Sequence, residues 1–82
     1  MKITIDPSSA DHPYVQLAGQ LRRGIETGEI GPRLPSIMEL TEQTGLAVGT
    51  VRRAVGILID EGLAITRPGR GTFVARPGER KS

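Results

Sequence analysis

The sequence predicts a mainly α-helical domain with a small β-sheet, a three-helix winged helix-turn-helix with a C-terminal β-hairpin wing. Three stretches carry apolar residues at helical spacing, and only a short turn at a glycine separates the second from the third. Two β-prone runs around a Gly-rich tip follow, which is typical of a β-hairpin. We expect residues 1–76 to form this domain and residues 77–82 to be a flexible polar tail.

The first predicted elements are a short strand and an amphipathic helix. Residues 2–5 alternate polar and apolar side chains, which indicates a strand. Residues 11–13 (Asp-His-Pro) are typical of a helix start, because proline is tolerated in the first turn. The apolar residues between 14 and 27 keep a spacing of three and four, so we expect a helix with one buried face that ends at Gly28.

The second helix follows a linker. Residues 29–35 are too rich in proline and glycine to be helical, and we expect Ile30 and Leu34 to enter the core. Ser36 and the glutamate three residues later have the spacing of a capping box, which predicts a helix start. That helix must stop near Gly45, because glycine suits the left-handed position after a helix end.

The third helix is predicted over residues 47–61. Its buried face carries five apolar residues at helical spacing: Val51, Ala54, Val55, Leu58 and Ile59. Its opposite face carries Val48, Gly49, Arg52, Arg53 and Gly56. In a helix-turn-helix the second helix of the motif lies in the major groove of DNA, with its N-terminal residues nearest the bases. A helical hairpin packed only for stability is the alternative at this point.

The predicted hairpin joins residues 63–67 to residues 72–76. We expect its inner side chains to be Leu63, Ile65, Phe73 and Ala75, and its exposed edge and tip to carry Arg67, Arg70 and Arg76. An arginine between two glycines suits contact with a phosphate or a narrow minor groove. The alternative is a hairpin that only covers the core.

Charge is distributed unevenly along the chain. The net charge is +2, but residues 1–47 hold four basic and six acidic side chains, whereas residues 48–82 hold seven basic and three acidic ones. The positive charge therefore begins at the third helix. Binding to a polyanion requires such a local concentration more than a large total.

The composition argues against several other functions. The chain has no cysteine and only one histidine, His12, so we expect no metal site; the lack of cysteine suits our expectation of a cytoplasmic protein. Two aromatic residues are too few for a single-strand binder that stacks bases. Asp60 and Glu61 adjoin at a helix end and not across a cleft, so we expect no catalytic residue, no cofactor and no enzyme activity. No apolar run reaches membrane-spanning length.

Four motifs occur in order along the chain: LPS at 34–36, TVRRA at 50–54, EGL at 61–63 and GRGTFV at 69–74. With them the chain resembles, over about residues 3–76, the DNA-binding head of the GntR family of bacterial transcriptional regulators. The resemblance implies a winged helix that binds operator DNA, usually as a dimer on an inverted repeat, here with no effector domain and no small-molecule effector site. It also implies DNA contacts by Ser36, Thr50, Arg52 and Gly71.

The sequence departs from the family pattern at Met38, Ala47 and Val48, where apolar side chains replace polar or charged ones. We expect a sequence-specific regulator that binds double-stranded DNA with helix 47–61 in the major groove and wing 67–72 on the adjacent backbone or minor groove. The predicted contacts are Ser36, Val48, Gly49, Thr50, Arg52, Arg53, Arg67, Arg70, Gly71 and Thr72. A weak homodimer on DNA is also expected. The alternative is a protein-docking module, which an apolar recognition face favours.

Overall fold

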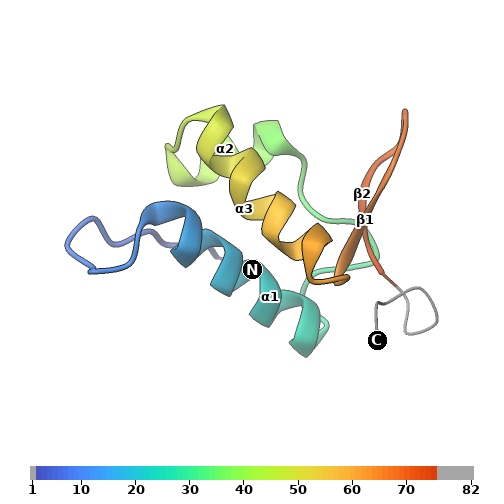
Figure 1. Cartoon of the computed structure of the whole chain (residues 1–82), viewed down its shortest axis with the longest axis horizontal. Helices are drawn as coiled ribbons and strands as arrows, with labels where there is room; N and C mark the ends of the chain where they lie inside the picture. The colour runs from blue at the N-terminus through green and yellow to red at the C-terminus, as the bar shows by residue number, and fades with distance from the viewer. Residues whose placement is uncertain (1, 76–82) are drawn as a thin grey trace.

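Three helices followed by one β-hairpin form the fold, in the predicted order (Figure 1). The computed structural model describes residues 2–75, so the predicted tail and Arg76 lie outside the described residues. The elements are α1 (Pro13–Thr27), α2 (Ile37–Thr44), α3 (Val48–Asp60), β1 (Ala64–Arg67) and β2 (Gly71–Val74). The strands pair antiparallel, with Ala64 opposite Val74 and Arg67 opposite Gly71.

The ends of α2 follow from its sequence. The Ser36 hydroxyl accepts a hydrogen bond from the Glu39 backbone N–H at 3.0 Å, and the Glu39 side chain accepts one from the Ser36 N–H, so the predicted capping box is present. Gly45 closes the helix with a φ of 73°, a conformation that residues with a Cβ atom rarely adopt. This turn lets α3 begin only three residues later.

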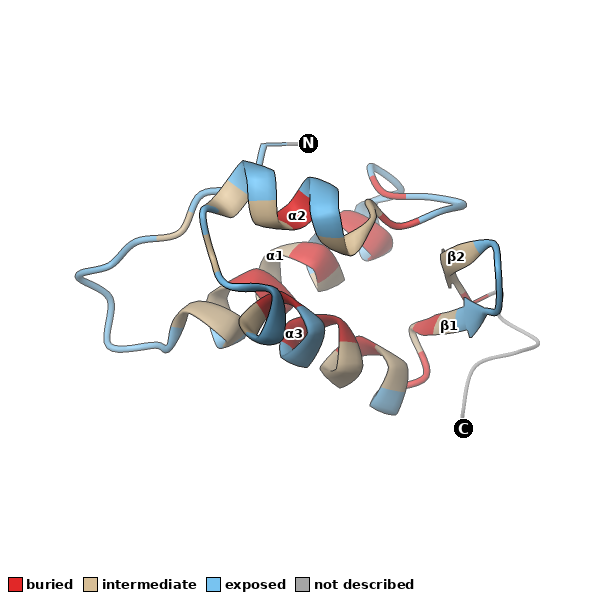
Figure 2. Cartoon of the chain, turned by 90° about the horizontal axis from the view of Figure 1, so that it is seen from above, coloured by how far each residue is buried: buried red, intermediate tan, exposed pale blue. Residues whose placement is uncertain are grey.

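The core lies where α1 and α2 pack against α3. The predicted face of α3 is buried, with Val51, Ala54 and Leu58 fully enclosed and Ile59 half-buried. Opposite them lie Leu17 and Leu21 of α1, while the linker and α2 contribute Ile30, Leu34 and Leu40. Figure 2 shows these buried residues on the inward sides of the three helices. The opposite face of α3 does not contribute to this core.

The predicted strand at residues 2–5 is wrong. Its backbone has no strand partner and bonds instead to a glutamine side chain of α1: the Thr4 N–H donates to Gln20 Oε1 at 3.0 Å, and Gln20 Nε2 donates to the Thr4 carbonyl at 2.6 Å. Gln16 binds the Asp6 backbone in the same two-way manner. The alternation of side chains is real, because Ile3 is buried, but glutamine amides satisfy the backbone.

The linker before α2 extends the sheet. Arg33 forms an isolated antiparallel bridge with Phe73, the Leu34 N–H donates to the Thr72 carbonyl at 2.9 Å, and the Val74 N–H donates to the Pro32 carbonyl at 2.7 Å. β2 is therefore held on both edges, by β1 and by the linker. This pairing fixes the base of the hairpin against the helical core.

The inner face of the hairpin agrees with the prediction at Leu63 and Ala75 and differs from it at Ile65 and Phe73. Ala75 is buried and Leu63 packs against the core, as do Ala64 and Val74, whereas Ile65 and Phe73 are only partly buried and lie outside the core cluster. Successive strand residues face opposite sides, so an offset of one residue exchanges the two faces.

Among the helices formed by residues 2–75, none has the length and apolar character that a membrane span requires.

Candidate nucleic-acid interface

The N-terminal end of α3 and the tip of the hairpin lie on the same side of the molecule, the upper side in Figure 1. Figure 2 looks onto this side and shows both segments exposed. Near this end of α3 the exposed residues are Val48, Gly49, Arg52 and Arg53, and Thr50 is half-buried among them. The arrangement of α2, a turn at Gly45 and α3 is that of a helix-turn-helix, whose second helix enters the major groove. The residues predicted to approach bases are thus brought together.

Two neighbouring arginines on α3 have different surroundings. The guanidinium carbon of Arg53 lies 4.0 Å from the centre of the Tyr14 ring, within the range of a cation–π contact, and that ring stacks on His12. Arg53 is therefore held against the start of α1. Arg52 is exposed and has no side-chain partner among residues 2–75, so its guanidinium is free to bind an external acceptor.

Ser36 has a structural role that leaves part of its hydroxyl unused. Its oxygen accepts the Glu39 N–H at the start of α2. A serine hydroxyl also carries one hydrogen, which can be donated while the oxygen accepts. The first turn of a helix favours negative charge, because its N–H groups lack intrahelical partners. The hydroxyl hydrogen of Ser36 therefore remains available to an external acceptor such as a phosphate oxygen.

The tip of the hairpin is a tight turn. The Arg70 N–H donates to the Arg67 carbonyl at 2.9 Å, with Pro68 and Gly69 between them and a φ of 75° at Gly69. Proline followed by a glycine of positive φ is the sequence that a type II turn requires. This turn exposes the Arg70 side chain, which has no partner among residues 2–75. The Arg67 guanidinium carbon lies 5.9 Å from the centre of the Phe73 ring.

Arg33 also belongs to this region, although no motif in the sequence points to it. Its guanidinium packs over Gly71, where a Cβ atom would come within 3.1 Å of Arg33 Nε. Gly71 also has a φ of 117°, which residues with a Cβ atom rarely adopt, and the Arg33 side chain would have to shift slightly to admit one. Thr72 follows it, half-buried, and its carbonyl accepts a bond from the linker. The hairpin thus carries a third arginine, supplied by a residue nearly forty positions earlier.

Glu61, at the end of α3, forms an ion pair with α1. Arg22 of α1 binds both of its carboxylate oxygens, with Nε–Oε1 at 2.9 Å and Nη2–Oε2 at 2.8 Å. These bonds raise the pKa of Arg22, so the guanidinium stays charged. The pair joins α1 to the end of α3 and does not face the exposed end that carries Arg52.

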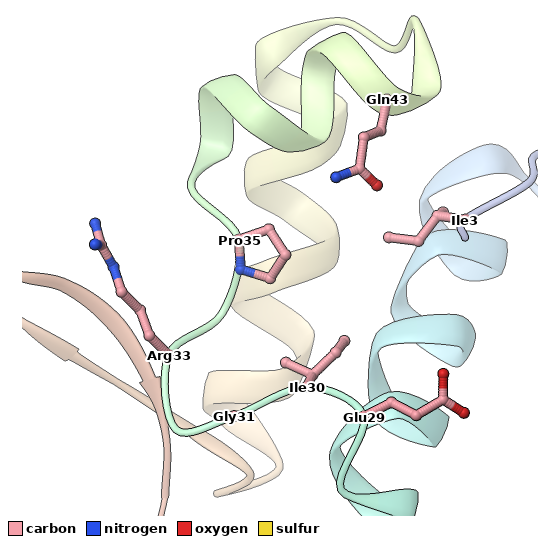
Figure 3. A pocket seen from close by; sticks show the side chains of 7 residues that line it. All are labelled: Ile3, Glu29, Ile30, Gly31, Arg33, Pro35 and Gln43. Atoms are coloured by element: carbon pink, nitrogen blue, oxygen red, sulfur yellow. The ribbon is translucent and has the colours of Figure 1, made fainter. Parts of the chain in front are cut away.

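The close-up in Figure 3 shows a shallow hollow beside the linker, with a volume of about 220 Å³. Ile3, Ile30 and Pro35 line it together with Gly31 and three polar residues, Glu29, Arg33 and Gln43; in Figure 3 the Arg33 side chain extends away from the other lining residues. Pockets for small ligands are usually larger, about 300–1,000 Å³, and have convergent polar groups. We assign no ligand to this hollow. Residues 2–75 also contain no cluster of three or more potential metal ligands.

Comparisons with known proteins agree with this geometry. Residues 13–74 match the family described as bacterial regulatory proteins, gntR family. The chain belongs to the GntR family. It is 46% identical over 66 residues to the HTH-type transcriptional repressor NagR of Bacillus subtilis, a match that covers 78% of this chain and 27% of NagR. The chain therefore spans about a quarter of that relative's length.

Two solved structures are similar to the structure of this chain. YtrA from Sulfolobus acidocaldarius, a GntR-family transcription factor, superposes with a TM-score of 0.84 and 36% identity, covering 93% of this chain and 82% of YtrA. The DNA-binding domain of AraR in complex with operator ORX1 superposes with a TM-score of 0.81 and 32% identity, covering 90% of this chain and 96% of that one. These findings confirm the predicted winged helix-turn-helix and place the chain in a family of bacterial regulatory proteins.

Proposed function

We propose that the chain binds double-stranded operator DNA with the N-terminal end of α3 in the major groove and the hairpin tip on the flanking backbone or minor groove. The observation that supports this most is the position of Arg52 and Arg70. Both are exposed, on two segments that lie on the same side of the fold (Figure 1), and neither has a side-chain partner within residues 2–75. Unpaired arginines on a protein surface suit phosphates and guanine edges.

The other predicted contact residues have different roles in this proposal. Ser36 and Thr50 donate hydroxyl hydrogens to phosphates, and Gly71 allows the hairpin backbone to lie close to the DNA. Thr72 supports the hairpin base, and Arg67 with Arg33 adds positive charge near the tip. Arg53 acts mainly through its contact with Tyr14, which orients the side chain before any DNA arrives. No catalytic role, metal or cofactor enters the proposal.

A dimer on DNA is also part of the proposal, following the family resemblance. Two copies bind the halves of an inverted repeat, and the free chain is monomeric or associates weakly at micromolar concentration. Sedimentation of the free chain and of its mixture with a palindromic duplex tests this. A tight dimer without DNA would contradict weak self-association, and a single copy on the palindrome would contradict dimeric binding.

A protein-docking function is the alternative, and one observation favours it: Met38 and Val48 have 64% and 45% of their surface exposed. Enrichment of a sequence from a pool of random duplexes, followed by titration of that duplex at several salt concentrations, separates the two functions. DNA binding predicts an enriched motif and an affinity that falls steeply with salt, because phosphate contacts release counterions. A docking module predicts no enriched motif and weak binding to every duplex.

A further inference from the structure

The N-cap residue and the first two residues of α3 carry no polar side chain. Ala47, Val48 and Gly49 are consecutive and all exposed, and Val48 exposes 45% of its surface. Ala47 is the N-cap residue and makes no side-chain hydrogen bond there. Thr50 is the first residue of the helix that has a polar side chain, and it is half-buried. The end of the helix placed nearest the bases is therefore built from methyl groups and backbone.

Such a surface distinguishes few of the groups in a major groove. Base edges there present hydrogen-bond donors and acceptors, and their one apolar group is the C5-methyl of thymine. Valine methyls placed against a donor or acceptor would remove its water without replacing the hydrogen bond, which is unfavourable. Against the thymine methyl group, the valine methyl groups gain van der Waals contact and no hydrogen bond to water is lost. An apolar first turn is therefore complementary to thymine.

Gly49 supports a close approach to the DNA. A Cβ atom built at this position meets nothing within 4 Å in the folded chain, so packing does not require glycine. Its φ is not positive either, unlike that of Gly45, which ends α2 with φ 73°. Glycine in a helix is less stable than alanine by up to about 1 kcal/mol. The missing side chain leaves space next to Val48 for a base-pair edge.

We propose that residues 47–49 form a thymine-reading surface, in which the Val48 side chain packs on the C5-methyl of a thymine and Gly49 lets the helix backbone approach the groove floor. The proposal rests on the DNA-binding function above and adds to it the base that the helix end selects. It predicts that the preferred operator half-site carries a thymine opposite the start of α3.

The test uses the whole chain and its selected duplex, in which each thymine is replaced singly by deoxyuridine. This replacement removes the methyl group and leaves base pairing intact. We expect deoxyuridine at one thymine of each half-site to weaken binding about three- to fivefold, the effect of one buried methyl group. Val48→Ala should bind the unmodified duplex about as weakly as the wild type binds the deoxyuridine duplex, and should lose its sensitivity to the replacement.

The matched control is Val15→Ala, because Val15 is a similarly exposed valine, at 40%, on α1. This variant should keep the full deoxyuridine effect. A deoxyuridine effect that persists in Val48→Ala, or the absence of any sensitive thymine, would overturn the thymine-reading surface while DNA binding itself stands. Failure to enrich any duplex would contradict the proposed function and the inference with it. Circular dichroism of each variant verifies that it is folded.

Discussion

The two exposed ends of the proposed DNA surface differ in chemistry. The start of α3 is apolar, with Val48 and Gly49 outward, whereas the hairpin tip is charged, with Arg70 between two glycines and Arg33 behind it. Apolar contact with a base edge depends on which base is present, whereas a guanidinium attracts every phosphate alike. The difference assigns sequence selection to the helix end and general affinity to the hairpin end.

The two ends also differ in how they are held. The helix end continues directly into the buried face of α3, so Val51 fixes its position from within the core. The hairpin is held at its base by the backbone bonds that join β2 to the linker and by Ala64 and Val74, which pack against the core, whereas residues 68–70 at its tip are exposed. A helix that selects bases must be placed accurately, and a charged tip that binds backbone phosphates tolerates more freedom.

The largest expected effect concerns the core that both ends share. Leu58 is fully buried on α3, so Leu58→Ala should lower the free energy of unfolding by about 2–5 kcal/mol. Urea or thermal unfolding followed by circular dichroism measures this loss. If the midpoint hardly moved, the assignment of the inner face of α3 would be wrong, and with it the orientation of the helix end.

Arg52→Ala should have the next largest effect. It removes an unpaired guanidinium from the outer face of α3, so binding to the selected duplex should weaken by roughly 1–3 kcal/mol. Arg23→Ala is the matched control, since Arg23 is an exposed arginine on α1 and its loss changes net charge equally. Equal losses from the two variants, measured by fluorescence anisotropy, would show that total charge and not the placement of Arg52 matters.

Gly49→Ala tests whether the apolar start of α3 approaches the DNA closely. The added methyl group has room in the folded chain, so the protein should be at least as stable as before, yet binding to the selected duplex should weaken. Gly19→Ala, at an equally open glycine of α1, should raise stability by up to about 1 kcal/mol and leave DNA affinity unchanged. Unaltered affinity in Gly49→Ala would refute the close approach of this turn to DNA.

Much of the fold follows from the sequence, because local patterns determine it. The spacing of Val51, Ala54 and Leu58 specifies the inner face of α3, and Ser36 with Gly45 specifies both ends of α2. These signals involve residues within a few positions of one another. They also place most of the candidate contacts on α3 and the hairpin, so the candidate site was largely predictable.

Two of the missed features depend on contacts between distant segments. The bridge of Arg33 to Phe73 is a backbone pairing that leaves no side-chain pattern, and the stacking of Arg53 on Tyr14 depends on how α1 crosses α3. The hairpin face was offset by one residue because both of its sides carry apolar side chains, with Ile65 on one and Ala64 on the other. Alternation alone cannot choose between two apolar faces.

The central claim is that the start of α3 selects the sequence and the hairpin tip supplies general affinity. It is tested most directly by measuring the affinity of Arg70→Ala and Val48→Ala for two duplexes, the selected sequence and a scrambled one, across a range of salt concentrations. Arg70→Ala should weaken both complexes by the same factor and reduce the slope of log affinity against log salt by about one unit. Val48→Ala should weaken only the selected complex and leave the slope unchanged. The account is contradicted if Arg70→Ala alters the ratio of the two affinities, or if Val48→Ala leaves that ratio intact.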